Sequence, residues 1–354
     1  MKINILIASN SLKALAAASA FVLSALSLSA KQELNLYIWT EYLEPELIKS
    51  FEEKYDCKVI ESNFENNEEM VAKLQAGGSS QYDLVFPSDY IVPSMIKLGL
   101  LAELDHSKLP ELKNLSKQFQ NPSFDPGNKH TAAYQWGTVG LVYSKEKFKE
   151  PLTSWDILFK EDDAIRFSLF DSEREMTGIA LIYLGYPINS TDKNHLKAAA
   201  ELMIKAKKRK GFKGFDANVS GIGKIKGKTL DVTLSYSGNA FAAIAEDESL
   251  GYSIPKEGSA VWCDSMCMPK DAPNKDLAHK FINYILDPKV GAQLSNFTMF
   301  ATPNEASLPM IDAETLKNIS IYPDAETSKK LEFIKDAGPN TALFGEVWKM
   351  VKTR

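Results

Sequence analysis

Helical and extended patterns alternate along the first 110 residues of this chain of 354 residues. Apolar side chains at every second position predict a strand over 33–39, and an amphipathic stretch that opens with Glu44-Pro45 predicts a helix. A short strand over 58–61, a helix over 67–76 that ends at Gly77-Gly78, and an apolar strand over 83–86 follow. This alternation implies a mainly parallel sheet covered by helices on both faces.

The same alternation continues to the end of the chain. Strands are expected over 140–143, 167–170, 230–236, 252–254 and 260–263. Helices are expected over 179–184, 195–208, 240–245, 276–286, 290–294 and 343–351. Because a chain of this length exceeds one ordinary hydrophobic core, we expect two lobes.

Residues 1–30 differ in composition from the rest of the chain. They contain two lysines and no acidic residue, and an apolar run over 15–28 is followed by Ser29 and Ala30. A positive start, an apolar stretch and a small-residue end are the parts of a secretory signal peptide. The run is short for a membrane span, and an uncleaved anchor is the alternative. We expect cleavage beside Ala30, and a mature protein that diffuses freely in the periplasm.

Charge and cysteine content exclude some classes of protein. Removal of the two lysines of residues 1–30 changes the net charge from −5 to −7. An acidic protein repels nucleic-acid phosphates and favours cations, so no nucleic-acid partner is expected. The three cysteines, Cys57, Cys263 and Cys267, are an odd number without a repeating framework, and no disulfide scaffold is expected.

Carboxylates and aromatic rings gather at the ends of four predicted strands, over 39–42, 87–90, 171–175 and 262–265. Open α/β sheets present their ligand-binding groups at strand ends. A carboxylate accepts a charge-assisted hydrogen bond from an ammonium group, and an aromatic face attracts the same cation. These groups therefore favour an organic cation such as a diamine or a triamine, provided that the four strand ends converge.

Other interpretations of the same residues remain open. A tryptophan near a strand end is often part of the core, and Asp171 or Ser172 is suited to cap the next helix. Glu41 with Asp264 or Glu175 would suit the acid and base of an exported glycoside hydrolase. Residues 223–229 resemble a phosphate-binding loop but have the wrong glycine spacing, so a basic surface turn is expected there. The four histidines match no zinc motif, and no metal site is expected.

An ordered set of motifs resembles the bacterial spermidine/putrescine-binding proteins of ABC importers. The resemblance runs over about residues 33–354 and rests on Trp39-Thr40-Glu41-Tyr42, Asp83 to Ser88, Arg174-Glu175 and Trp262-Cys263-Asp264-Ser265. Supporting stretches are Tyr134 to Thr138, Thr153-Ser154-Trp155, Ala301 to Asn304 and Tyr322 to Thr327.

This resemblance implies the α/β, two-lobe fold of type II periplasmic binding proteins. Each lobe is a mainly parallel sheet flanked by helices, and the ligand lies in the cleft between the lobes. After a signal peptide over 1–30, lobe one would comprise 31–138 plus 263–308, and lobe two 139–262 plus 309–354. Hinge closure would trap the ligand.

The resemblance also implies a set of ligand-binding residues. They are Trp39, Thr40, Glu41, Tyr42, Ser88, Tyr90, Asp171, Glu175, Tyr236, Trp262 and Asp264. Glu41 and Asp264 would hold amine groups, with Glu175 as a further carboxylate, and the aromatic residues would contact the aliphatic chain.

The sequence departs from the family pattern at several positions. Two adjacent acids are replaced by Asp171-Ser172, and Tyr236, Phe300 and Ile334 stand where the family has Trp, Tyr and Gln. These changes leave open whether spermidine or putrescine is preferred, and which residue of the Asp171-Ser172 pair serves as a ligand.

The functional expectation is a transport protein without enzymatic activity. It would capture a polyamine in the periplasm, need no cofactor, act as a monomer and deliver the ligand to an ABC transporter permease. A carboxylate-dependent hydrolase, a polyamine sensor on the same fold, and a binding protein for another small cation are the alternatives.

Overall fold

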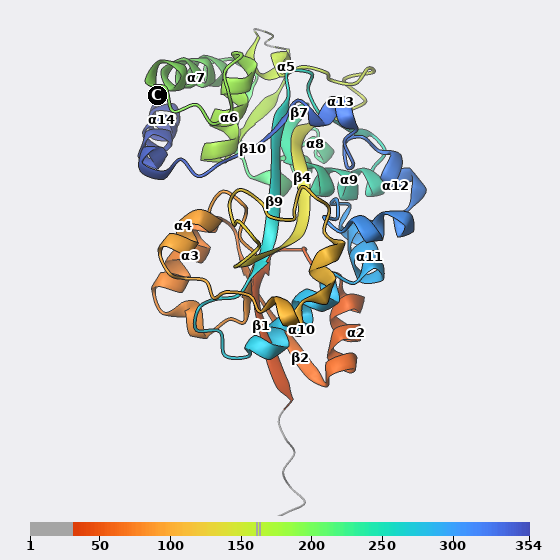
Figure 1. The fold of residues 1–354 in the computed structure, drawn as a ribbon. Coiled ribbons are helices and arrows are strands. Elements are labelled where there is room, and N and C mark those ends of the chain that lie inside the picture. Colours follow the sequence, from red (N-terminus) through yellow and green to blue (C-terminus); the bar gives the residue numbers. More distant parts are fainter. Residues whose placement is uncertain (1–30, 161, 163) are drawn as a thin grey trace, which may run out of the picture.

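The computed structural model describes residues 31–160, 162 and 164–354, so the predicted signal peptide lies outside the described residues. The described residues form one ten-stranded sheet (Figure 1). Its strands are β1 (Gln32–Trp39), β2 (Cys57–Phe64), β3 (Leu84–Val85), β4 (Thr131–Ser144), β5 (Phe167–Phe170), β6 (Phe212–Asp216), β7 (Val232–Tyr236), β8 (Leu250–Ser253), β9 (Ser259–Cys267) and β10 (Leu331–Phe333).

Helices flank this sheet along its whole length (Figure 1). The α-helices are α2 (Pro45–Tyr55), α3 (Asn67–Gln75), α4 (Val92–Lys97), α5 (Asp156–Phe159), α6 (Glu173–Tyr183), α7 (Lys193–Lys207), α8 (Asn218–Lys226), α9 (Ser237–Glu246), α10 (Lys275–Ile285), α11 (Pro288–Thr298), α12 (Ala313–Lys317), α13 (Ala325–Ser328) and α14 (Thr341–Thr353). The 3-10 helices are η1 (Gly78–Ser80), η2 (His106–Lys108), η3 (Pro110–Asn114), η4 (Glu305–Met310) and η5 (Gly338–Asn340).

The sheet consists of two parallel halves joined by an antiparallel pair. Its order is β2-β1-β3-β9-β4-β7-β5-β6, with β10 beside β9 and β8 beside β4. Strands β1, β2 and β3 are parallel, as are β5, β6 and β7. The long strands β4 and β9 run antiparallel to each other, with Thr131 opposite Cys267 and Thr138 opposite Val261. These two strands pass from one lobe into the other (Figure 1).

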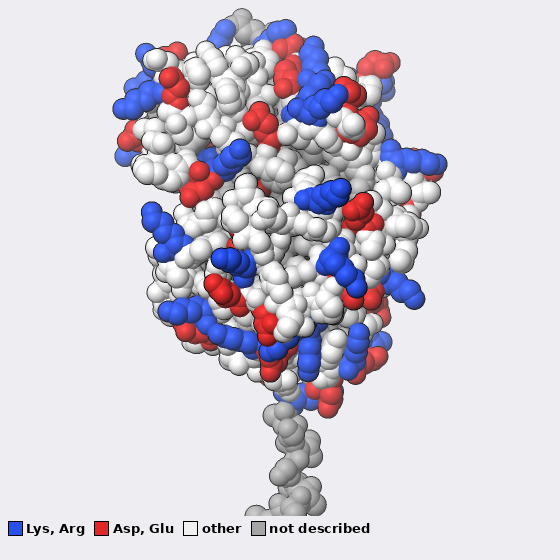
Figure 2. Space-filling view, viewed as in Figure 1, with Lys and Arg blue, Asp and Glu red and all other residues white. Residues whose placement is uncertain are grey.

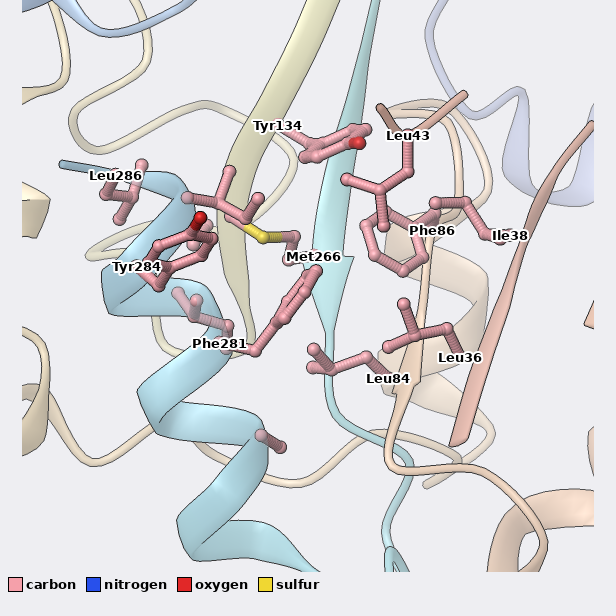
Figure 3. Packing of buried hydrophobic residues seen from close by; sticks show 14 of the residues in the cluster. Leu36, Ile38, Leu43, Leu84, Phe86, Tyr134, Met266, Phe281, Tyr284 and Leu286 are labelled. Atoms are coloured by element: carbon pink, nitrogen blue, oxygen red, sulfur yellow. The ribbon is translucent and has the colours of Figure 1, made fainter. Parts of the chain in front are cut away.

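Each half of the sheet has its own hydrophobic core. In the first half, Leu36 and Ile38 of β1 and Phe86 face Phe281 and Tyr284 of α10, as Figure 3 shows. On the opposite face, Tyr37, Phe64, Met70 and Val85 pack with α3 and α4. This alternation along β1 is the reason why the strand is recognisable from its sequence.

The second half is also covered on both faces. One cluster joins β5 and β7 to α6, α7 and α14, with Phe167, Met176 and Phe344 at its centre. A smaller cluster packs α8 and α9 against the other face, through Ile222, Ile225 and Ala240 among others. Val139 and Ala260 belong to the second core, whereas Tyr134 and Cys263 belong to the first, so β4 and β9 change cores over the same short stretch.

Several predicted elements are confirmed, and local chemistry explains them. Pro45 occupies the first turn of α2, and Asp56 ends that helix with a left-handed φ of 46°. The side chain of Asn66 accepts a hydrogen bond from Glu69 N and caps α3. Strand β5 spans the predicted residues 167–170 and is buried throughout, as expected for a strand covered on both faces.

Other elements differ from the sequence prediction. The prediction of a basic surface turn over 223–229 is wrong for residues 223–226, because α8 extends to Lys226. Gly221 lies close to β7, because an added Cβ there would approach Thr233 Oγ1 to 2.8 Å. A glycine at this position therefore allows α8 to pack closely against the sheet. Strands β6 and β10 were not predicted, and β4 and β9 extend further than the short segments that were expected.

The three cysteines are free and buried. Cys263 and Cys267 both lie on β9. Within the part of the chain that the structure describes, no helix has the length and apolar character needed to cross a bilayer.

Candidate functional site

Four of the predicted strand ends meet where β9 passes between the lobes. The segment after β3 pairs with β9 through a bridge between Ser88 and Asp264, and Ser265 N donates a hydrogen bond to Pro87 O. The segment after β1 reaches the same place through Tyr42, whose hydroxyl donates to Asp264 Oδ2 over 2.9 Å. From the second lobe, Tyr236 lies against Trp262 and also contacts Glu175. The convergence on which the sequence argument depended is therefore present.

Asp264 is the central carboxyl group of the site. Its side chain is 5% exposed, and its Oδ1 atom is buried without a hydrogen-bond partner among the described residues. Burial raises the pKa of Asp264 to about 7, and the charge of Glu175 adds to this, while the hydroxyls of Ser88 and Tyr42 oppose it. A buried carboxyl with one free oxygen is suited to bind a cationic donor.

Aromatic rings enclose this carboxyl group. The ring of Trp262 contacts Tyr236 with a centroid distance of 5.5 Å and Phe300 with 5.1 Å, both edge to face. Phe300 in turn contacts Tyr42 at 5.5 Å. The indole Nε1 of Trp262 is buried without a hydrogen-bond partner among the described residues. Gly137 makes room for this indole, because a Cβ there would approach its ring to 2.8 Å.

Glu175 supplies a carboxylate from the first turn of α6. The hydroxyl of Tyr236 donates to its Oε1 over 3.2 Å, and the hydroxyl of Ser172 donates to its Oε2. The neighbouring Arg174 interacts electrostatically with Glu175 but hydrogen bonds elsewhere. Its Nη2 donates to Lys335 O over 2.9 Å, and its guanidinium lies 4.1 Å from the ring centre of Phe344. No ion pair within the described residues neutralises Glu175.

A hydrogen-bond network fixes the wall that follows β3. Asn67 Nδ2 donates to Ser88 Oγ over 3.1 Å and to the hydroxyl of Tyr90 over 3.0 Å, while its Oδ1 accepts from Ser88 N. Sequence reasoning named Ser88 and Tyr90 but missed Asn67, which is 3% exposed. Its position at the start of α3 gave no local signal of this role.

Asp89 lies in the strand end 87–90 that the sequence singled out, but it is absent from the predicted set of ligand-binding residues. It is 2% exposed, and its Oδ2 is buried without a partner among the described residues. Its Oδ1 accepts only from the adjacent Tyr90 N, and its own N donates to Cys263 O over 2.9 Å. Burial raises the pKa of Asp89 well above its ordinary value, and the charges of Asp264 and Glu175 add to the rise.

The first motif of the prediction divides into buried and exposed residues. Trp39 is partly buried, its indole donates to Phe86 O over 2.9 Å, and its ring lies 4.3 Å from that of Phe64. Thr40 and Glu41 are exposed, and Glu41 has a left-handed φ of 57°. The structure therefore does not bring Glu41 into the buried group around Asp264, and its predicted role as an amine ligand stays a prediction.

Asp171 and Ser172 face different surroundings. Asp171 is exposed and forms an ion pair with Lys352 of α14, with 2.7 Å between Oδ1 and Nζ. Ser172 contacts Glu175 instead. Of the two residues at this position, Ser172 is the one that hydrogen bonds to a site carboxylate, and a ligand role for Asp171 stays a prediction.

A cavity of about 320 Å³ opens beside this group of residues. Asp89 and Tyr90 line it from the first lobe, and Ile334, Lys335 and Asp336 line it from the segment after β10. The site and this cavity share Asp89 and Tyr90. Ile334, at the position where a glutamine was expected, makes this part of the cavity less polar.

The charge of the buried group differs from that of the surface. Figure 2 shows acidic and basic side chains interspersed over one face of the molecule. In contrast, Asp89, Asp264 and Glu175 interact electrostatically with one another, and no lysine or arginine within the described ranges pairs with them. No group of three or more His, Cys, Asp or Glu among those residues is arranged to hold a metal ion. The site therefore suits an organic cation.

The chain belongs to the bacterial extracellular solute-binding protein family, whose model matches residues 46–321. Its fold is that of the type II periplasmic binding proteins. The chain is 34% identical over 338 residues to a Salmonella typhimurium protein named spermidine/putrescine-binding periplasmic protein, with 95% of this chain and 96% of that protein covered. It is also 34% identical to a putrescine/agmatine-binding protein of Pseudomonas aeruginosa, over 92% of this chain and 93% of that protein.

A solved structure has the same architecture. The spermidine/putrescine ABC transporter substrate-binding protein of Streptococcus pneumoniae superposes with a TM-score of 0.79 at 33% identity. The match covers 91% of this chain and all of that chain.

Proposed function

We propose that this protein captures a polyamine, spermidine or putrescine, in the cleft between its lobes. The observation that carries the proposal is Asp264, a buried carboxyl group with an unpartnered oxygen, enclosed by the rings of Tyr42, Tyr236 and Trp262. A polyamine alternates ammonium groups with methylene segments. The carboxyl groups of Asp264 and Glu175 accept hydrogen bonds from the ammonium groups, and the aromatic rings pack against the methylene segments.

The proposed ligand contacts follow from this geometry. Asp264 and Glu175 bind two amine groups, Trp262 and Tyr236 pack against the chain between them, and Tyr42, Ser88 and Tyr90 hold these groups in place. Trp39, Thr40, Glu41 and Asp171 complete the set expected from the sequence. The proposed lobes are 31–138 plus 263–308 and 139–262 plus 309–354, which agrees with the change of core along β4 and β9.

The cellular role that we propose is delivery rather than chemistry. The mature protein acts in the periplasm as a monomer, without a cofactor, and passes its ligand to the permease of an ABC transporter. The names of its relatives support this role, since each is described as a binding protein. Their descriptions give no support to a hydrolase that uses the same carboxylates.

The test is isothermal titration of the mature protein, refolded to remove bound ligand, with spermidine, putrescine and spermine. We expect micromolar or tighter binding of at least one of them, and its loss in Asp264→Ala. Glu103→Gln, at an exposed acid outside the site, is the control and should bind as the wild type does. Absence of heat with all three amines, from protein shown to be folded and ligand-free, would contradict the proposal.

A further inference from the structure

Two of the buried acids of the site lie next to each other on paired strands and have no cationic partner. Ser88 is directly opposite Asp264, and Asp89 N donates to Cys263 O, so the two acids belong to adjacent pairs of one ladder, and the charge of Asp264 acts on Asp89. Asp89 and Asp264 are 2% and 5% exposed, and each has one oxygen without a partner among the described residues. Two ionised carboxylates in such surroundings would repel each other without water to screen them.

The groups that face these acids add negative charge rather than positive charge. Glu175 acts on both Asp89 and Asp264. Their other polar or titratable neighbours are Tyr42, Ser88, Tyr90, Tyr134, Tyr236, Cys263 and Cys267. Arg174 lies beside Glu175 and Tyr90 but donates to Lys335 O. In the adjoining cavity, Lys335 is accompanied by Asp336, and both are exposed. No base among these groups pairs with either acid.

We propose that the empty cleft holds protons on Asp264 and Asp89, and that entry of the cationic ligand releases protons from this pair to solvent. Asp264 is the acid that contacts the ligand, whereas Asp89 is a positioning residue that acts through the charge of Asp264. Each proton that is released converts one carboxylic acid into a carboxylate. The ligand keeps its own ammonium protons. This inference rests on the proposed function, because it requires a cation at Asp264.

The electrostatics of the two acids support this coupling. Burial is the main cause that raises the pKa of Asp264 to about 7, and the charge of Glu175 adds to it. The pKa of Asp89 is raised well above its ordinary value by burial, and the negative charge of Asp264 raises it further. An ammonium group in contact with Asp264 favours the carboxylate and lowers both pKa values. Capture of the ligand and loss of protons are therefore linked.

The linkage predicts how affinity depends on pH. Below pH 7 the ligand must displace a proton from Asp264, so the association constant should rise by about tenfold per pH unit for each proton released. The rise should end above the pKa of the acid in the empty protein. In Asp89→Asn one acid of the pair no longer titrates, so fewer protons should be released per bound ligand, while affinity at pH 8 stays within about threefold of the wild type.

The experiment is isothermal titration at pH 6, 7 and 8 in two buffers that differ in ionisation enthalpy, with the polyamine that binds the wild type. The difference in heat counts the protons released per bound ligand. We expect about one or more protons at pH 6, fewer at pH 8, and fewer at pH 6 in Asp89→Asn than in the wild type. Asp89→Ser is the second variant, since its hydroxyl also accepts from Tyr90 N, and Glu103→Gln is the control.

The outcomes separate this inference from the proposed function. Saturable binding with equal heats in both buffers at every pH would overturn the proton coupling and leave polyamine binding intact. An unchanged number of released protons in both Asp89 variants would overturn the role of Asp89. If no polyamine binds at any pH, the proposed function and the inference both fail. A carboxyl ¹³C NMR titration of the ligand-free protein checks the protonation directly, and an Asp264 that titrates near pH 4 would contradict it.

Discussion

The two walls of the site are built differently. The wall from the first lobe is fixed by hydrogen bonds among its own residues, with Asn67 joined to both Ser88 and Tyr90 and with Tyr42 joined to Asp264 on β9. The wall from the second lobe consists of Glu175 and Tyr236, and both oxygens of Glu175 already accept hydrogen bonds. Free acceptor atoms are therefore concentrated at Asp264 and Asp89, on the side of the first lobe.

This difference indicates which lobe dominates affinity. An acceptor that lacks a protein partner gains most from a ligand, because the ligand removes the cost of a buried unsatisfied atom. An acceptor that already has two donors gains less from a third. We therefore expect the carboxyl group of β9 to contribute more to binding than that of α6.

The largest expected effect is that of Asp264→Asn. Removal of a buried charge that contacts a cation should weaken binding by at least about 30-fold, which corresponds to about 2 kcal/mol. Isothermal titration at pH 8 measures this, and circular dichroism confirms that the variant is folded. A dissociation constant within threefold of the wild type would show that the wall of the first lobe does not dominate.

Glu175→Gln should have a smaller effect, on the order of tenfold. The amide keeps an acceptor for Ser172 or Tyr236, so the loss reflects the charge rather than the network. Titration of both variants against the same amine orders the two walls. If Glu175→Gln weakens binding more than Asp264→Asn does, the assignment of the dominant wall is reversed.

The aromatic residues that join the walls are tested by Trp262→Phe. Trp262 contacts Tyr236 from one lobe and Phe300 from the other, and its indole nitrogen lacks a partner in the described structure. Loss of the larger ring should weaken binding by roughly threefold to 30-fold. The ligand-dependent change in tryptophan fluorescence should fall with it, and an unchanged spectral response in the variant would place the ligand elsewhere.

The pH dependence of stability follows from the raised pKa of Asp264. Its folded-state pKa of about 7 exceeds its ordinary value of 3.8, so the protonated form favours folding. This contribution is complete below pH 3.8 and is lost as the pH rises to about 7. The difference in Tm between the ligand-free wild type and Asp264→Asn (wild type minus variant) should therefore decrease from pH 5 to pH 7. A difference that rises over this range would contradict the raised pKa.

The smallest expected effect is that of Asp171→Asn. The side chains of Lys352 and Asp171 are 35% and 41% exposed, and ion pairs accessible to water contribute at most about 1 kcal/mol to stability. Because Asp171 is directed toward α14, we expect its loss to change affinity by less than about threefold. A tenfold or greater loss would favour the ligand role that the sequence pattern suggested, and would add a second acid to the wall of the second lobe.

The sequence is informative where burial alternates along an element. Leu34, Leu36 and Ile38 occupy one face of β1, and this period identifies the strand without any tertiary information. The first part of β4 was missed because Thr131 to Gln135 is buried without alternation, as a strand covered on both faces must be. Strand β6 was missed for a related reason, since Lys213 and Gly214 interrupt its apolar pattern.

The candidate site was predictable only in part. Trp262, Asp264 and Glu175 stand in recognisable motifs, and the structure brings them together. Asn67 and Asp89 are polar residues whose burial results from contacts far along the chain, with Ser88 and Cys263 respectively. No local pattern distinguishes such a residue from a helix start or a turn, because the surroundings that change its chemistry exist only after folding.

Cys263 gives the molecule a built-in reporter of motion. Its thiol is fully buried, on the strand that connects the lobes and adjacent to the central carboxyl group of the site. A thiol reagent dissolved in water reaches it only when β9 separates locally from its neighbours. The rate of thiol modification therefore measures how often this part of the sheet opens. A ligand that contacts Asp264 stabilises this part of β9 and should slow the modification, so the natural chain reports ligand binding without an attached label.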